Sequence, residues 1–288
     1  MEDIQITDVR CLPGDSGFLI HNKNTAILYD TGFAFTGYRL AENVKRVLGE
    51  QTLDFVFLTH SHYDHAAGTP YVLRKYPDAK VIAGEYAVSV FSRPTAKARM
   101  SDLDRKFATR CGVLEYEDLI DELKVDIAVN DGDELKCGDM TFRVIALPGH
   151  TKCSVGFYLE EKKLLLGTET LGVYFGDNTY LPSYLVGYEM TMESFRKAKE
   201  LDIEGILLPH YGAVHREEAK TYLASSEAVA RETAVRIKHM LNSGSSKEEI
   251  TSYFKKYIYK DNVAPTYPID AFELNTSIMI DSIESELT

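Results

Sequence analysis

The stretch Leu58-Thr59-His60-Ser61-His62-Tyr63-Asp64-His65 places four potential metal ligands in one short loop. It follows the mostly apolar run 54–58 and precedes Ala66-Ala67-Gly68, so we expect it in a turn where a buried strand gives way to a helix. Neutral imidazoles and a carboxylate suit zinc, and they also accept iron or manganese. Because three of the chain's eight histidines fall within six positions, the pattern favours a metal site over a surface loop that happens to be rich in histidine.

Two further histidines follow apolar runs in a similar way. His150 comes after the run 144–147 and a Pro-Gly pair, and His210 comes after the run 205–208 and a proline. A single histidine after a strand is more often a hydrogen-bonded loop residue than a metal ligand. Its recurrence at three expected strand ends reverses that preference. We therefore predict one metal site from His60, His62, Asp64, His65, His150 and His210.

With these motifs in this order, the chain resembles the metallo-β-lactamase-fold hydrolase superfamily from about residue 17 to residue 215. The motifs are a strand ending in Asp30-Thr31-Gly32, the His-x-His-x-Asp-His loop, a Gly-His-Thr turn, an acidic strand end and a late histidine. The resemblance implies an α+β fold, a four-layer αββα sandwich, here with an added C-terminal helical segment. It also implies two divalent metal ions, with zinc favoured and iron or manganese as alternatives.

By this resemblance, the first metal would be held by His60, His62 and His150, and the second by Asp64, His65 and His210. The bridging carboxylate would be Glu169, which follows the run 164–166, although the family usually has aspartate there. Because glutamate is longer by a methylene, bridging would require the strand end to retreat or the metals to shift. The alternative is that Glu169 is an exposed loop residue.

Asp30 matches the family carboxylate that orients the ligand loops, as outer partners of metal sites generally do. A simple turn former in Asp-Thr-Gly is the alternative for this residue. The candidate catalytic residues are Asp64 and Tyr174, the latter as a protic group assisting departure of the leaving group. Ordinary packing is favoured for Tyr174, because the chain has 18 tyrosines.

The predicted function is metal-dependent hydrolysis of a small ester, thioester or lactone by a metal-bound hydroxide, formed where two metals about 3.5–4 Å apart lower the pKa of a shared water. A phosphodiesterase with the same dinuclear site is the first alternative. A non-catalytic, metal-containing ligand sensor is an alternative from a different class. An oxygen- or nitric-oxide-reducing diiron protein ranks lower, because His62 stands where that pattern has glutamate.

Composition fits a globular enzyme, with 288 residues, 44% hydrophobic and 26% charged. The net charge of −12 argues against nucleic acid, because nucleic-acid binding relies on lysine and arginine contacts. We expect a small-molecule substrate, no membrane partner and a possible homodimer. The acidic start of the chain leads into no apolar stretch, which predicts a cytoplasmic protein without a signal peptide. The four cysteines form no Cys-x-x-Cys pair and are interpreted as reduced structural thiols.

The expected organisation is a catalytic core over residues 1–215 and a helical segment over 216–288, acting as a cap or a dimerisation surface. A charged helical insertion near 92–125 would lie beside the site, with a solvated face favoured over a basic substrate clamp. Thr191 is expected to cap a helix that runs to about residue 201. Ser246 and Glu249 offer a capping box. Other expected helices are 38–48 and 70–76, and expected strands include 26–29, 80–83, 141–147, 154–159, 163–166 and 205–208.

Overall fold

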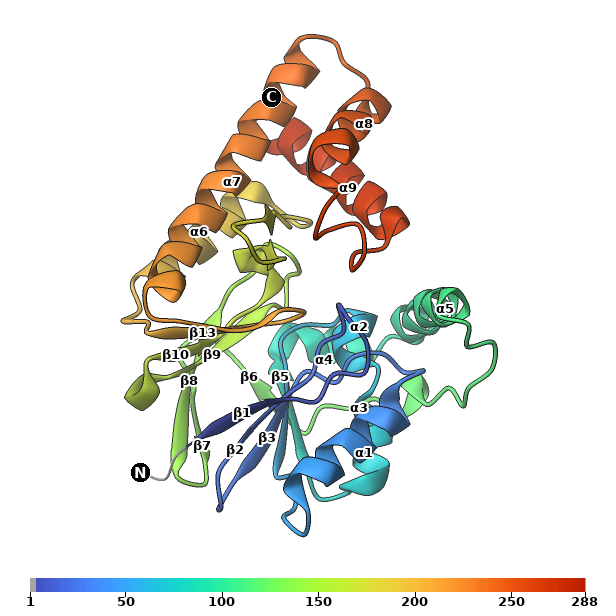
Figure 1. Ribbon diagram of the computed structural model, residues 1–288, viewed down its shortest axis with the longest axis vertical. Coiled ribbons are helices and arrows are strands. Elements are labelled where there is room, and N and C mark those ends of the chain that lie inside the picture. Colours follow the sequence, from blue (N-terminus) through green and yellow to red (C-terminus); the bar gives the residue numbers. More distant parts are fainter. Residues whose placement is uncertain (1–3, 288) are drawn as a thin grey trace. The chain divides into compact units, whose positions relative to one another are not determined.

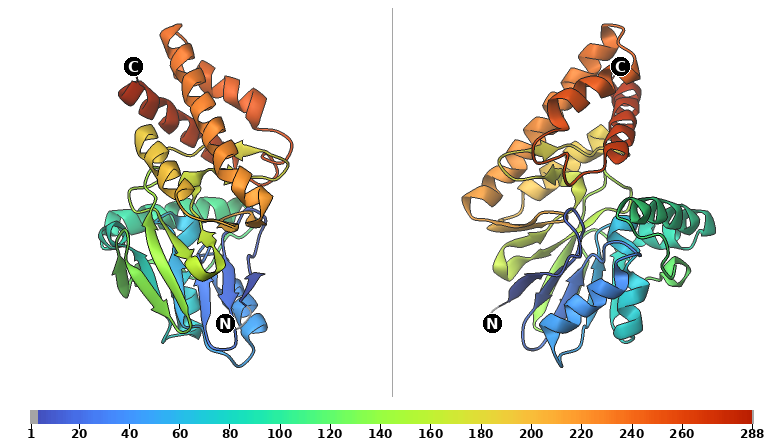
Figure 2. Two further views of the ribbon diagram at one scale, coloured as in Figure 1. Left: turned by 90° about the vertical axis from the view of Figure 1, so that its left-hand side faces the viewer. Right: turned by 45° about the vertical axis from the view of Figure 1, so that its right-hand side comes forward.

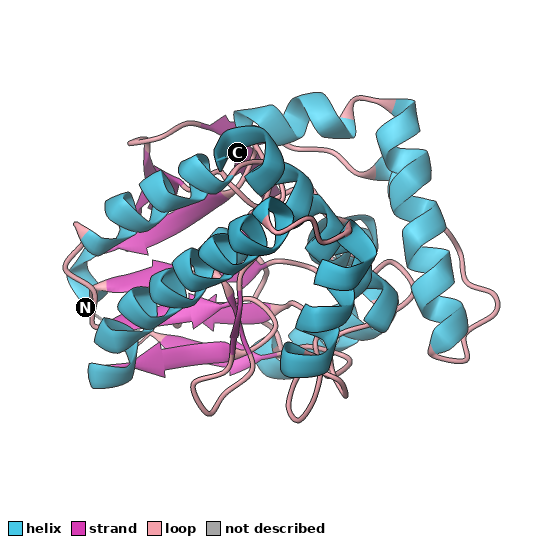
Figure 3. Cartoon of the chain, turned by 90° about the horizontal axis from the view of Figure 1, so that it is seen from above, coloured by secondary structure: helices cyan, strands magenta, loops and turns pink. Residues whose placement is uncertain are grey.

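The computed structural model describes residues 4–287, a mixture of helices and strands (Figure 3). The chain divides into two compact units, one of residues 1–146 and 155–160 and the other of residues 147–154 and 161–288. The acidic start on which the prediction of no signal peptide was based lies at residues 1–3, outside the described residues. Within residues 4–287, no helix is both long and apolar enough to span a membrane.

The first unit contains a six-stranded sheet in the order β1-β2-β3-β4-β5-β6. These strands are β1 Gln5–Asp8, β2 Phe18–His21, β3 Ala26–Tyr29, β4 Phe55–Leu58, β5 Lys80–Gly84 and β6 Ile127–Val129. β1, β2 and β3 pair antiparallel, and β3 to β6 pair parallel. Because β3 and β4 are parallel neighbours, their carboxyl ends meet at one edge of the sheet, which places Asp30 beside the loop that begins at Thr59.

The α-helices of this unit, among the residues that the structure describes, are α1 Gly37–Leu48, α2 Tyr63–Ala66, α3 Thr69–Lys75, α4 Glu85–Phe91 and α5 Pro94–Arg110. Figure 1 shows α1 and α3 beside the strands β1 to β3. A Cβ atom on Gly37 would lie 2.5 Å from the ring of Tyr71, so glycine is what allows α1 to approach α3 this closely. The short helix η1, Ile120–Glu122, follows α5.

The same unit also contains the antiparallel strands β7 Glu134–Cys137, β8 Met140–Ala146 and β9 Val155–Leu159. They face the first sheet through aromatic side chains. The ring of Phe57 on β4 lies 5.2 Å from that of Phe142 and 4.3 Å from that of Phe157, measured between centroids. All three rings are fully buried, so the hydrophobic core of the unit lies between the two sets of strands.

In the second unit, β10 Leu164–Leu166 is parallel to β13 Gly205–Leu208, and β13 is antiparallel to β14 Gly212–His215. A small hairpin joins β11 Val173–Tyr174 and β12 Tyr180–Leu181. The helices are α6 Tyr188–Lys199, α7 Glu217–Asn242, α8 Lys247–Ile258 and α9 Ile269–Leu287, with the short helices η2 Glu160–Lys162 and η3 Glu169–Leu171. Figure 2 shows α7, α8 and α9, orange to red, forming the C-terminal helical segment.

Most expected elements are confirmed within one or two residues. The capping box is also present, with Glu249 N donating to Ser246 Oγ at 3.2 Å and Ser246 N donating to Glu249 Oε2 at 2.8 Å. The expected division into a core and a helical segment at residue 216 stays a prediction. The two compact units follow the packing of the chain and do not test it. Within the insertion, residues 94–110 form α5 and residues 120–122 form η1, and the residues 111–119 between them are irregular.

The prediction that Thr191 caps a helix is wrong, because α6 begins at Tyr188 and Thr191 lies inside it. The Thr191 hydroxyl donates to the carbonyl of Gly187 one turn earlier, at 2.9 Å. The first backbone amides of α6 instead donate to the Glu286 carboxylate of α9. Tyr188 N donates to Oε1 at 3.1 Å, and Glu189 N donates to Oε2 at 2.9 Å. A carboxylate from a distant helix thus replaces the local N-cap side chain.

Candidate metal centre

The histidine-rich loop follows β4 as predicted, and α2 begins within it. His60 and His65 are fully buried, and the His60 ring centroid lies 4.0 Å from that of His65 and 4.6 Å from that of His62. Asp64 Oδ2 lies 3.8 Å from His65 Nε2. The His-x-His-x-Asp-His sequence therefore gathers three imidazoles and a carboxylate within one turn of chain.

Asp30 fixes the orientation of two of these imidazoles. His65 Nδ1 donates to Asp30 Oδ2 at 2.8 Å, and Thr59 N donates to Asp30 Oδ1 at 2.8 Å. The Thr59 hydroxyl lies 2.9 Å from Asp30 Oδ2 and from His60 Nδ1. With the hydroxyl proton directed to the carboxylate, His60 Nδ1 is the donor to Thr59, so both imidazoles carry their proton on Nδ1 and present Nε2 as the basic nitrogen. The predicted orienting role of Asp30 matches this geometry.

The Asp-Thr-Gly turn also fixes the backbone of α2. Thr31 N donates to the carbonyl of His65 at 2.7 Å, and Gly68 N donates to that of Gly32 at 3.1 Å. A Cβ atom on Gly68 would lie 2.0 Å from the carbonyl oxygen of Thr31, so only glycine permits this approach. The local sequence after the loop is thus adapted to hold it against the end of β3.

In the second unit, four contacts hold the turn that carries His150. Its Nδ1 lies 2.7 Å from Ser183 Oγ, and its amide donates to Thr170 Oγ1 at 3.1 Å. Immediately before it, the Ser194 hydroxyl of α6 donates to the carbonyl of Pro148 at 2.6 Å, and Val186 N donates to that of Gly149 at 2.8 Å. With Nδ1 engaged by Ser183, His150 also presents Nε2 as its second nitrogen.

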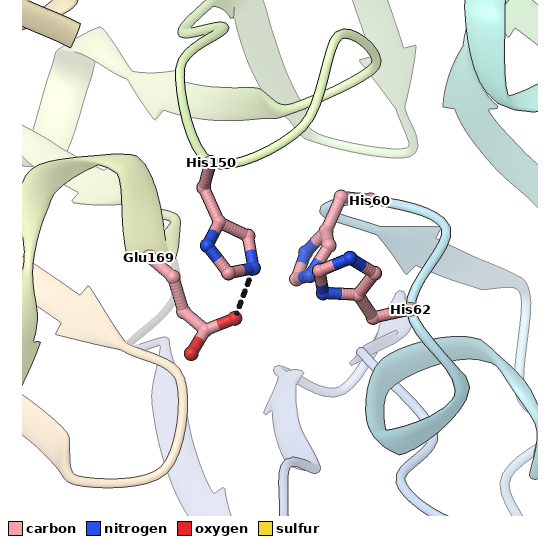
Figure 4. A group of neighbouring side chains, drawn as sticks. All are labelled: His60, His62, His150 and Glu169. Carbon is pink, nitrogen blue, oxygen red and sulfur yellow. Dashed lines mark ion pairs between the residues drawn. The ribbon is translucent and has the colours of Figure 1, made fainter. Parts of the chain in front are cut away.

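Glu169 occupies the end of the strand-to-η3 connection and is buried, with 5% of its surface exposed, which excludes the exposed-loop alternative. Its Oε2 lies 2.9 Å from His150 Nε2, the ion pair drawn in Figure 4, and its Oε1 lies 3.4 Å from His210 Nε2. One carboxylate therefore contacts both histidines that this unit supplies. His210 adopts a left-handed backbone conformation, with φ of 61°.

The remaining candidates have ordinary structural surroundings. Tyr174 is 6% exposed, packs against Tyr180 and Tyr222, and donates its hydroxyl to Glu218 at 3.2 Å. Burial raises the pKa of Tyr174 to about 12. Cys153, three residues after His150, is buried, with its Sγ 3.2 Å from Thr151 Oγ1.

Helix α5 of the insertion packs against α2, which begins within the histidine-rich loop. The ring of Phe107 stacks on Phe33 at 4.7 Å, and Phe33 lies 5.7 Å from Tyr63, the residue between His62 and Asp64. Two basic residues of the insertion form ion pairs with nearby acidic residues. Arg105 pairs with Asp118 at 3.0 Å, and Lys106 pairs with Asp102 at 2.7 Å. These contacts favour the solvated face over a basic substrate clamp.

The donor set itself fits divalent metals. The first unit supplies three imidazoles and a carboxylate, from His60, His62, His65 and Asp64. The second unit supplies two imidazoles and a carboxylate, from His150, His210 and Glu169. In each unit these are nitrogen and oxygen ligands of the kind that bind zinc, iron or manganese. The Nδ1 protonation of His60 and His65 leaves the nitrogen that a metal requires. Sequence reasoning did not identify Thr59 or Ser183 as partners of the ligands, and Ser183 carries no local signal because it lies 33 residues from His150.

Comparison with known proteins assigns the family. The model of the metallo-beta-lactamase superfamily matches residues 9–210, so the chain belongs to this superfamily, and the predicted α+β sandwich class is confirmed. Among curated relatives, the hydroxyacylglutathione hydrolase of Brucella anthropi is 26% identical over 170 residues, which cover 58% of this chain and 51% of that protein. The chain therefore spans about half the length of the curated relatives it matches.

Two solved structures share the fold over nearly the whole chain. A metallo-beta-lactamase family protein from Thermus thermophilus has a TM-score of 0.65 at 17% identity, covering 98% of this chain and 93% of its own. An archaeal superfamily protein from Sulfolobus tokodaii has a TM-score of 0.60 at 17% identity, covering 99% and 100%. At this identity the likeness concerns the fold alone.

Proposed function

We propose that the protein is a metal-dependent hydrolase of a small ester, thioester or lactone. In this proposal His60, His62 and His150 hold one divalent metal, Asp64, His65 and His210 hold a second, and the Glu169 carboxylate serves both. The observation that carries the proposal is the engagement of Nδ1 in His60, His65 and His150 by Thr59, Asp30 and Ser183. Such outer hydrogen bonds fix the tautomer and direct Nε2 to a metal.

When bound, the metals would supply Lewis acidity and lower the pKa of a coordinated water. The chain's own residues have separate tasks. Asp30 accepts the hydrogen bond from His65 Nδ1 and so directs Nε2 to the metal, and Glu169 places negative charge beside His150 and His210. Asp64 is partly exposed, and we propose that its carboxylate accepts a hydrogen bond from the attacking water.

Within this class a thioester is the favoured substrate. The supporting observation is the similarity to hydroxyacylglutathione hydrolases, since an acylglutathione is a thioester. The relatives are 26–27% identical and are matched over about half their length. A small-molecule partner, a cytoplasmic location and a homodimer stay predictions of the sequence.

The ligand assignment is tested with His62→Ala, which should remove metal and turnover together. His239→Ala is the matched control, because His239 is an exposed residue of α7 and no proposed ligand. Metal content is measured by elemental analysis of protein purified without added metal. If His62→Ala keeps the wild-type metal content, the ligand set is wrong.

The reaction class is tested on the wild-type protein with thioesters, lactones, aryl esters and an aryl phosphodiester. We expect turnover of one of the carboxylic ester classes and much slower release of the phenol from the aryl phosphodiester. Preferred cleavage of the diester would support the phosphodiesterase alternative instead. A metal-loaded protein without turnover on any substrate would favour the ligand sensor.

A further inference from the structure

The turn that carries Glu169 is held by the C-terminal helix α7. The hydroxyl of Tyr222 lies 3.0 Å from the carbonyl oxygen of Leu171 and 2.9 Å from that of Gly172. The hydroxyl of Ser226, one helical turn further along α7, donates to the same Leu171 oxygen at 2.7 Å. Tyr222 and Ser226 are 1% and 2% exposed, so water does not compete for these carbonyls.

The fit between the turn and the helix is close. Gly172 has a φ of 90°, and a Cβ atom there would lie 2.2 Å from Ser226 Oγ. The turn also contains two backbone hydrogen bonds of its own. Leu171 N donates to Thr168 O and Gly172 N donates to Glu169 O, both at 2.9 Å. Buried backbone groups require such partners. Helix α7 thus supplies the acceptor carbonyls of the turn with the donors that the turn itself lacks.

The position of this turn matters because of the side chain that it carries. The Glu169 carboxylate lies between His150 Nε2 and His210 Nε2, at 2.9 and 3.4 Å. Glutamate has one more rotatable bond than the aspartate usual in the family, so its carboxylate is less constrained by its own backbone. A fixed turn reduces the remaining freedom. Burial raises the pKa of the Tyr222 hydroxyl, so Tyr222 stays a hydrogen-bond donor at physiological pH.

We propose that Tyr222 and Ser226 are positioning residues, which set the location of the Glu169 carboxylate by holding the two carbonyls that follow it. The metal-binding consequence rests on the proposed function, whereas the effect on the turn does not. The C-terminal helical segment is then part of the scaffold of the site through α7, in addition to any role as a cap or a dimerisation surface.

The test compares Tyr222→Phe and Ser226→Ala with Tyr180→Phe. Tyr180 is a buried tyrosine of the same aromatic cluster, with its ring centroid 5.6 Å from that of Tyr222, and its hydroxyl is bonded to Ser225 rather than to the turn. Removing one hydroxyl from either ring preserves the packing. We expect Tyr222→Phe and Ser226→Ala to weaken metal binding by about 10-fold or more, and Tyr180→Phe to leave it within about 2-fold.

A double-mutant cycle separates positioning from general destabilisation. If the two hydroxyls act through Glu169, adding Tyr222→Phe to Glu169→Gln should lower the metal affinity by less than about 2-fold further. Competition with a chromophoric chelator measures the affinities. Equal losses of affinity in both backgrounds, or the same loss in Tyr180→Phe, would overturn the inference.

Amide hydrogen exchange of the metal-free protein measures the stability of the turn independently of metal binding. The amides of Leu171 and Gly172 should exchange faster in Tyr222→Phe and Ser226→Ala than in the wild type or in Tyr180→Phe. If the wild-type protein binds no metal at all, the proposed function fails, and exchange alone decides the positioning role. Unchanged protection of both amides would refute it.

Discussion

The Asp30 carboxylate accepts a hydrogen bond from His65 Nδ1 at 2.8 Å, and both residues are fully buried. Asp30 adopts a left-handed backbone conformation, with φ of 57°, which aspartate tolerates better than most residues. The pair joins the end of β3 to the histidine-rich loop. If His65 binds a metal as proposed, a carboxylate so placed would act on the metal through the histidine, without touching it.

Asp30→Asn should therefore weaken metal binding by about 10- to 100-fold, because the amide replaces an anionic acceptor with a weaker neutral one. Asp102→Asn on the exposed surface of α5 is the control. Chelator competition measures the affinity of both variants. Wild-type affinity in Asp30→Asn would leave Asp30 with the role of a turn former.

Glu169→Gln should weaken the second metal more than the first, because the first retains three histidines in the proposed assignment. Glu169→Asp should retain both metals, since it keeps the charge and shortens the reach by one methylene. Metal stoichiometry and turnover of the two variants give the comparison. Full occupancy and a normal rate in the glutamine variant would remove Glu169 from the ligand set.

Tyr174→Phe tests the candidate proton donor. Its hydroxyl is bonded to Glu218, and its raised pKa disfavours the phenolate, so we expect turnover within a few-fold of the wild type. Loss of that hydrogen bond should cost about 0.5–1.5 kcal/mol of unfolding free energy. A turnover rate lowered by two orders of magnitude, with unchanged stability, would instead support a catalytic role for Tyr174.

Asp104 gives the stability of the protein a pH dependence. It is fully buried in α5 and accepts hydrogen bonds from Ala34 N at 2.8 Å and Phe35 N at 3.2 Å. Burial is the largest influence on this carboxyl and raises its pKa from 3.8 to about 6. The folded state therefore binds the proton more tightly than the unfolded state, and stability falls as pH rises from about 4 to about 6.

Asp104→Asn should remove this contribution. Between pH 4 and pH 7 the unfolding free energy of the wild type should fall relative to that of the variant by roughly 1–3 kcal/mol. Urea unfolding of both metal-free proteins across this range measures the difference. Parallel profiles would show that Asp104 titrates alike in the folded and unfolded states.

The sequence by itself determined the features that depend on neighbours along the chain. The His60-x-His62-x-Asp64-His65 loop, the strand before it and the Ser246 capping box all rest on contacts within a few residues, and the structure contains each of them. The apolar runs before His150 and His210 also form the strands β8 and β13. Local spacing was sufficient because a short apolar run bounded by turn residues indicates a buried strand, and the residues after the run then lie at the strand's end.

Tertiary structure alone decided which groups orient these ligands. Ser183 beside His150, Glu286 at the start of α6, and Tyr222 with Ser226 on the Glu169 turn lie between 33 and about 100 residues from their partners. A serine or a tyrosine at such a position has no distinguishing pattern in sequence, because its role depends on which backbone group approaches within about 3 Å. That approach is set by the packing of whole helices and strands, and the orientation of the candidate ligands follows from it.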